Sequence, residues 1–185
     1  TTVSPDSIQV TLRPNECARE TVRLATGAAP IPRLDLVFAI DVTSSMSGII
    51  DEATRSSDRI VEQVRQLVPD TQFGLITFSD YPGTGGFLSL FVGYGGPDDY
   101  PWRLDQDLTP DKAQIKDALG RIALKDGGDG PESYLRALFE TRSVSWRRGS
   151  RRVVVLFGDS KPHDPDPGPD EQVGTADDLT QEVVI

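Results

Sequence analysis

The strongest constraint on the fold is a nearly unbroken apolar stretch at residues 34–40, which ends at Asp41. Such a stretch is typical of a strand buried in a parallel sheet. Two hydroxyl side chains, Thr43 and Ser45, follow Asp41 at alternate positions. This set contains oxygen donors and neither a thiolate nor an imidazole, which suits Mg²⁺ or Mn²⁺ better than Zn²⁺ or Cu²⁺. The stretch therefore predicts a buried strand that leads directly into a candidate cation site.

The length of the chain fits one domain and a smaller appendage, and 37% hydrophobic content over 185 residues is enough for a core. In the appendage, residues 8–12 alternate between apolar and polar side chains, and residues 21–24 follow after a turn. This pattern predicts two strands of a small β element, followed by a stiff proline-rich connector. We therefore expect a β segment with its connector at residues 1–33 and the main domain at residues 34–185.

Strands and amphipathic helices alternate along the main domain, which predicts an α/β fold with a parallel sheet and right-handed crossovers. The expected elements begin with a strand at 34–40, a helix at 48–68, a strand at 73–78, and a short strand at 87–92 followed by a loop through 100–102. Two helices come next: one starts at Thr109 and ends at Gly127, and the other opens at 129–132. A buried strand at 151–157, a surface loop at 162–174 and a last helix capped by Thr175 complete the order.

Oxygen ligands recur in two further predicted loops. Glu132 lies at the start of a predicted helix, and Asp159 follows the second buried strand. In open α/β sheets, sites form outside the carboxyl ends of the strands, so we expect both residues to meet Asp41 there. Each feature also has a plainer explanation, because hydroxyl residues often cap helices and an acid at a helix start favours the helix dipole. The combination favours one metal site formed by Asp41, Thr43, Ser45, Glu132 and Asp159.

This combination resembles the von Willebrand factor type A family over residues 34–185. The first loop matches the DxTxS form of the metal-ion-dependent adhesion site of that family, with Met46 after it as in many bacterial members. Residues 129–132 are similar to the DxPE loop of integrin β chains, and Asp159 matches the aspartate of the third loop. The resemblance implies a three-layer, Rossmann-like fold with a doubly wound, mostly parallel sheet.

The resemblance also implies a function. Thr43 and Ser45 would bind Mg²⁺ directly, with Mn²⁺ or Ca²⁺ as alternative ions, while the three acidic residues would act directly or through water. A position left to water would accept a carboxylate from a protein partner. We therefore expect a protein-binding module of adhesion type and not an enzyme. The alternative is a structural or regulatory scaffold of a larger protein, in which the metal orders the loops.

The chain departs from the family pattern in two places. Gly48 and Ile49 stand where integrin β chains have the acidic pair of an adjacent second metal site, so we expect no second site there. The family fold has further strands after the last predicted helix. We therefore expect either a truncated form or another element that covers the edge of the strand at residues 151–157.

A β segment before such a domain favours an extracytoplasmic location, by resemblance to bacterial proteins.

Other functions are less compatible with the sequence. A net charge of −10 and a pI near 4.5 argue against nucleic acid or an anionic membrane as the main partner, so we expect the arginines at 147, 148, 151 and 152 to form a charged loop. No apolar segment has the length of a membrane span. Single Cys17 forms no internal disulfide.

An esterase of GDSL type is a third alternative, with Ser160 as nucleophile and His163 as base. The order and spacing of these residues differ from those of that family, which favours a solvent-exposed loop position for His163. Three aromatic residues are candidates for the rim of the metal site, although packing over the sheet explains them equally well. They are Tyr81, Tyr100 and Trp102.

Overall fold

A computed structural model of the protein describes residues 2–4, 23–25, 33–83, 94–128 and 130–184. The chain divides into two compact units after Ile31. In the first unit, β1 (Thr2–Ser4) pairs antiparallel with β2 (Arg23–Ala25). The predicted strand at residues 21–24 overlaps β2, and the predicted strand at residues 8–12 lies outside the described residues.

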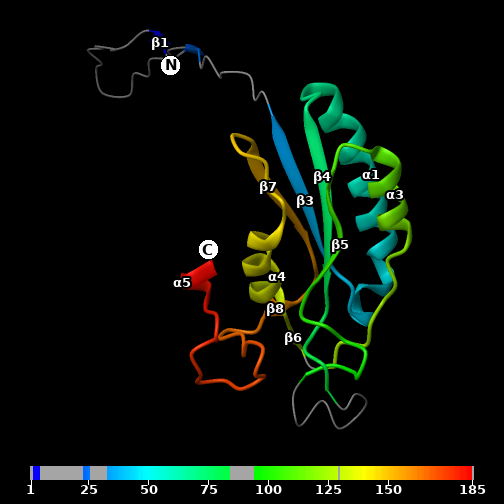
Figure 1. Ribbon diagram of the computed structural model, residues 1–185, viewed down its shortest axis with the longest axis vertical. Helices are drawn as coiled ribbons and strands as arrows, with labels where there is room; N and C mark the ends of the chain where they lie inside the picture. The colour runs from blue at the N-terminus through cyan, green and yellow to red at the C-terminus, as the bar shows by residue number, and fades with distance from the viewer. Residues whose placement is uncertain (1, 5–22, 26–32, 84–93, 129, 185) are drawn as a thin grey trace, which may run out of the picture. The chain divides into compact units, whose positions relative to one another are not determined.

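The second unit is built on a four-stranded sheet in the order β5-β4-β3-β7. The strands are β3 (Leu34–Asp41), β4 (Thr71–Phe78), β5 (Arg103–Thr109) and β7 (Arg151–Phe157). β3 pairs in parallel with both β4 and β7, whereas β5 runs antiparallel to β4. Every residue of β3 is buried, because a strand lies on each side of it and helices cover both faces of the sheet (Figure 1). The predicted α/β fold with a mostly parallel sheet is confirmed.

The helices form the two outer layers. On one face, α1 (Ile50–Leu67) and α3 (Lys112–Gly120) pack against Leu36, Phe38 and Ile40 of β3. On the other face, α4 (Tyr134–Glu140) packs against Val37 and Ala39 (Figure 1). The remaining elements are short: η1 (Ser44–Gly48), β6 (Pro131–Glu132), η3 (Thr141–Ser143), β8 (Lys161–Pro162) and α5 (Gln181–Val184). None of the helices in the described part of the chain has the length and apolarity needed to cross a bilayer.

Two features of the middle of the chain differ from the prediction. β5, in which Leu104 and Leu108 flank two acidic residues and a glutamine, follows the expected loop at residues 100–102 and was not predicted. The helix expected to start at Thr109 is capped instead by Asp111, whose carboxylate accepts a hydrogen bond from the amide of Ala113 at 2.8 Å. That helix ends at Gly120 and not at Gly127. The predicted strand at residues 87–92 lies outside the described residues.

The last third of the chain also differs from the prediction. β7 is an edge strand and is only partly buried, with Leu156 40% exposed, whereas a buried strand was expected. Glu132 belongs to β6, which pairs with β8, and α4 starts after it. Thr175 donates a hydrogen bond to Asp177 at 2.6 Å and caps no helix, since α5 begins at Gln181. Local side-chain bonds in this acidic segment replace the expected cap.

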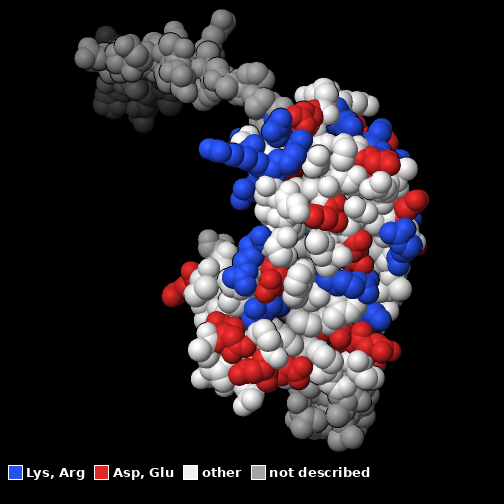
Figure 2. Space-filling model, viewed as in Figure 1, with Lys and Arg blue, Asp and Glu red and all other residues white. Residues whose placement is uncertain are grey.

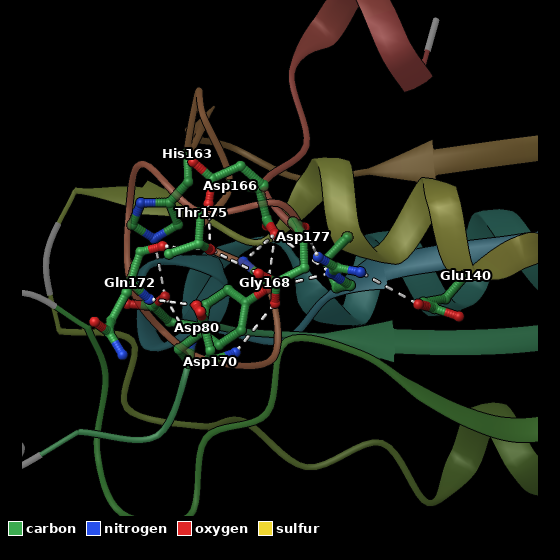
Figure 3. A network of polar contacts seen from close by, with 12 residues as sticks. Asp80, Glu140, His163, Asp166, Gly168, Asp170, Gln172, Thr175 and Asp177 are labelled. Carbon is green, nitrogen blue, oxygen red and sulfur yellow. Dashed lines mark hydrogen bonds and ion pairs between the residues drawn. The ribbon is translucent and has the colours of Figure 1, made fainter.

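The segment expected to be a surface loop is held against α4 by buried polar contacts (Figure 3). Asp166 is fully buried and accepts hydrogen bonds from Tyr81 Oη at 2.7 Å and from Arg136 Nε at 3.3 Å. Arg136 also donates to the carbonyl oxygen of Asp177 at 3.0 Å. A buried carboxylate needs such a counter-charge. This network explains why part of the segment is buried, and it places Tyr81 in the interior instead of at a rim.

A second buried carboxylate lies at the amino end of the sheet. Asp35 is completely buried and accepts hydrogen bonds from Arg147 Nε at 2.6 Å, from the Arg147 amide at 2.8 Å and from Ser150 Oγ at 2.7 Å. Arg147 also pairs with Asp70, which in turn pairs with Arg33 at 2.9 Å. The predicted arginine-rich loop is therefore partly structural, because it joins the starts of β3 and β7. Figure 2 shows lysine and arginine residues gathered at this end of the sheet.

We predict that Asp35→Ala lowers the free energy of unfolding by about 3 kcal/mol, because it leaves Arg147 partly buried beside an empty carboxylate position. Urea denaturation measures the change. Glu52→Ala is the matched control, because Glu52 also pairs with arginine, in its case Arg55 and Arg59, but on an exposed helix face. The stability lost in this variant should be much smaller. Equal losses in the two variants would contradict a structural role for the buried pair.

Candidate metal centre

The first loop of the site follows directly from the end of β3. Asp41 is the last residue of the strand and is completely buried. Its Oδ1 atom accepts hydrogen bonds from the Thr43 amide at 2.9 Å and from Thr43 Oγ1 at 2.7 Å. These bonds turn the chain into η1, so that Thr43 and Ser45 lie on the same side of the loop, with their hydroxyl oxygens 3.0 Å apart.

Asp159, after β7, completes a row of oxygen atoms across the edge of the sheet. Ser45 Oγ donates a hydrogen bond to Asp159 Oδ1 at 2.9 Å. The row therefore runs from Asp41 through the two hydroxyl groups to Asp159. Asp41 and Thr43 are buried, whereas Ser45 and Asp159 are exposed. One side of the row consequently faces the protein interior, and the other side is accessible to solvent.

Glu132 reaches the same region from β6 and is buried. The amide of His163 donates to the Glu132 carbonyl oxygen at 3.0 Å, which fixes the backbone of β6. Gly127, with a φ of +60°, packs against both the first loop and Glu132: a Cβ added there would lie 3.0 Å from Thr43 Cβ and 3.2 Å from Glu132 Oε1. Both the positive φ and these close neighbours favour glycine at position 127, which packs against Thr43 and Glu132 at once.

The structure adds one residue to the site that the sequence analysis missed. Tyr134 Oη donates a hydrogen bond to Asp41 Oδ2 at 2.9 Å and accepts one from the amide of Ser160 at 3.0 Å. A Cβ at Gly158 would overlap the Tyr134 hydroxyl, so only glycine fits at that position. In the sequence, the glycine before Asp159 was the one sign that another side chain packs against this loop. It points to Tyr134 only once the positions of β7 and α4 are known.

The electrostatics of Asp41 are unusual for an aspartate. Burial raises its pKa, hydrogen bonds from Thr43 and Tyr134 oppose that change, and the nearby charge of Asp159 adds to it. Burial also raises the pKa of Tyr134, so its hydroxyl keeps its proton and remains a donor to Asp41. Within the part of the chain that the structure describes, the ionised form of Asp41 is favoured by the hydrogen bonds from Thr43 and Tyr134.

The structure brings Asp41, Thr43, Ser45 and Asp159 into one row of close oxygen contacts, and Gly127 packs against both Thr43 and Glu132. Asp129 lies outside the described residues. Throughout the described ranges, no group of three or more His, Cys, Asp or Glu side chains is arranged so that it could hold a metal ion. The hydroxyl oxygens of Thr43 and Ser45 lie between the two aspartates of the row.

The residues of the esterase alternative are engaged elsewhere. Ser160 Oγ donates to the carbonyl oxygen of Gly130, and His163 Nε2 lies 2.9 Å from Asp80 Oδ1. His163 is partly buried, and Tyr94 contacts its ring, so the expectation of a solvent-exposed position is wrong. Among the other two aromatic candidates, Tyr100 Oη lies 2.8 Å from Thr77 Oγ1, and Trp102 packs against the core on the α4 side.

Comparison with known proteins identifies relatives of similar sequence. Alpha-protein kinase vwkA of Dictyostelium discoideum is 24% identical over 161 residues, which cover 82% of this chain and 23% of the relative. Integrin beta-4 of Rattus norvegicus is 27% identical over 170 residues, which cover 87% of this chain and 9% of the relative. The chain thus spans less than a quarter of the length of either relative.

A solved structure shares the fold. The vWF domain of the type V pili tip protein Mfa5 from Porphyromonas gingivalis has a TM-score of 0.51 and 17% identity, with 72% of this chain and 39% of that chain covered. The family profile of the von Willebrand factor type A domain matches residues 35–184, which is most of the chain. With a mostly parallel sheet between two helical layers over the same residues, the chain belongs to the von Willebrand factor type A domain family.

Proposed function

We propose that this domain binds a protein partner through one divalent cation and has no catalytic role. Domains of this family mediate protein–protein interaction and adhesion. The cation would be Mg²⁺, with Mn²⁺ or Ca²⁺ as alternatives, because the available ligands are all oxygen atoms. The partner would supply a carboxylate to the coordination position that the protein leaves to water.

The main support for this proposal is the distance between the hydroxyl oxygen atoms of Thr43 and Ser45. Each hydroxyl has one proton, and both protons are already used, by Thr43 toward Asp41 at 2.7 Å and by Ser45 toward Asp159 at 2.9 Å. Their oxygen atoms, 3.0 Å apart, therefore both offer lone pairs. Adjacent ligands of an octahedral Mg²⁺ ion with bonds of about 2.1 Å are separated by about 3.0 Å. The spacing thus fits two neighbouring ligands of one Mg²⁺ ion.

The acidic residues would complete the ligand set. Thr43 and Ser45 would bind directly, while Asp41, Asp159 and Glu132 would act directly or through water. In this assignment the loop that ends at Glu132 is the integrin-like DxPE version of the second loop. Without a cation, a chain with a net charge of −10 would repel an acidic partner. A bound cation at the exposed side of the row would provide the attraction that the protein lacks.

We predict that Ser45→Ala weakens Mg²⁺ binding at least about tenfold, because it removes one hydroxyl ligand and frees Asp159 from its hydrogen bond. Isothermal titration calorimetry measures the affinity. Ser47→Ala is the matched control, since Ser47 is exposed in the same short helix η1. A Ser45→Ala variant with wild-type affinity would exclude this ligand set.

We predict that Asp41→Asn abolishes the thermal stabilisation by Mg²⁺ without lowering the melting temperature in chelator. Burial raises the pKa of Asp41, so ionising it costs stability in the folded, metal-free protein. That cost is absent at low pH and grows as pH rises from the usual aspartate range through the raised pKa. The advantage of the variant in chelator should therefore grow over the same window. If Asp41→Asn melted at a lower temperature than the wild-type protein in chelator at neutral pH, the expected cost of ionising Asp41 would be contradicted.

We predict that the bound metal keeps an exchangeable water that a carboxylate displaces. With Mn²⁺ in the site, the enhancement of water proton relaxation should decrease when acetate is added and stay constant with acetamide. The exposed side of the row, at Ser45 and Asp159, is the expected point of access. Relaxation that is insensitive to acetate would indicate a closed site and would favour the scaffold function instead.

A further inference from the structure

The Tyr134 hydroxyl joins two loops of the candidate metal site. It donates to Asp41 Oδ2 at 2.9 Å in the first loop and accepts from the Ser160 amide at 3.0 Å in the third. Tyr134 itself is not one of the predicted metal ligands. Both contacts depend on a side chain that comes from a helix on the other side of the sheet from α1. Tyr134 is therefore in a position to control how Asp41 approaches a cation.

The position of this hydroxyl is rigid. Tyr134 is 7% exposed, and its ring packs edge-on against Phe78 with centroids 4.9 Å apart. The absence of a side chain at Gly158 leaves just the space that the phenol ring and hydroxyl occupy. A group fixed by packing on one side and by a backbone amide on the other cannot follow Asp41 if that carboxylate rotates. The bond to Oδ2 therefore restrains the carboxylate.

The hydrogen bonds to Asp41 leave little coordinating capacity. A carboxylate has about four lone-pair positions. Thr43 uses two of them on Oδ1, and Tyr134 uses one on Oδ2. With one position left, on Oδ2, Asp41 can act through a single oxygen or through a water molecule. Bidentate coordination, which needs both oxygen atoms, would require these hydrogen bonds to break.

This restriction distinguishes between ions. Mg²⁺ prefers six ligands at about 2.0–2.1 Å and retains water, whereas Ca²⁺ takes six to eight ligands at about 2.3–2.6 Å and often binds a carboxylate through both oxygen atoms. On the basis of the proposed function, we propose that Tyr134 is a specificity-determining residue: by holding Asp41 Oδ2, it makes the site favour Mg²⁺ over Ca²⁺. Removal of the hydroxyl frees Oδ2 and relaxes that preference.

The test compares the dissociation constants of Mg²⁺ and Ca²⁺, measured by calorimetry, in the wild-type protein and in Tyr134→Phe. We expect the variant to bind Mg²⁺ about tenfold more weakly and Ca²⁺ with equal or higher affinity, so that the ratio of affinities falls about tenfold. Tyr81→Phe is the matched control. It also removes a buried hydroxyl from a buried aspartate, Asp166, which is not one of the proposed metal ligands, so the ratio should stay at the wild-type value.

The possible results separate the two proposals. If Tyr134→Phe weakened the binding of Mg²⁺ and Ca²⁺ equally, or left the ratio of their affinities unchanged, the role of Tyr134 would be overturned and the proposed metal site would stand. The same ratio change in Tyr81→Phe would also overturn it, since the effect would then be a general loss of stability, and melting temperatures in chelator monitor that loss. Wild-type protein that binds neither ion would overturn both the role of Tyr134 and the proposed function.

Discussion

The parallel pairing of β3 with strands on both sides is the constraint on which the rest of the structure depends. Ile40 lies opposite Phe157 of β7, and Asp41 lies opposite Phe78 of β4. Because the three strands run in the same direction, their carboxyl ends meet at one edge. The loop after β3 and the loop after β7 therefore begin side by side. The contact between Ser45 and Asp159, which lie 114 positions apart in sequence, is a direct result of this register.

The sheet could be predicted where burial is strong. Residues 34–40 and 73–78 are apolar runs that a strand buried on both faces requires, and the structure confirms both. β5 was missed because it is an edge strand with Asp105 and Asp107 on it, so its composition is typical of a loop. Its place depends on tertiary contacts, such as the hydrogen bond from Thr77 to Asp105 at 2.5 Å. Local sequence carries no information about such a contact.

The candidate site shows the same division. Asp41, Thr43, Ser45 and Asp159 follow predicted strands, so their meeting could be inferred from topology. Tyr134 could not be inferred, because an aromatic residue at the start of an amphipathic helix is typical of a core position. Its role depends on a hydroxyl at one end of the ring and on the absence of a side chain at position 158. Those facts become connected only in three dimensions.

Two buried aspartates in β3 are balanced in different ways, and the difference supports a cation at one of them. Both are completely buried in the low-dielectric interior, where an ionised carboxylate is costly without an opposite charge.

Asp35, at the amino end of the strand, meets the guanidinium of Arg147 at 2.6 Å. Asp41, at the carboxyl end, accepts hydrogen bonds from an amide, an alcohol and a phenol, none of which is charged, and none of the ion pairs identified within the described ranges includes it. The chain therefore supplies a counter-charge to the aspartate that joins its strands. The other aspartate is linked through Thr43 to the exposed residue Ser45, where a divalent cation could supply that charge and remain open to a partner.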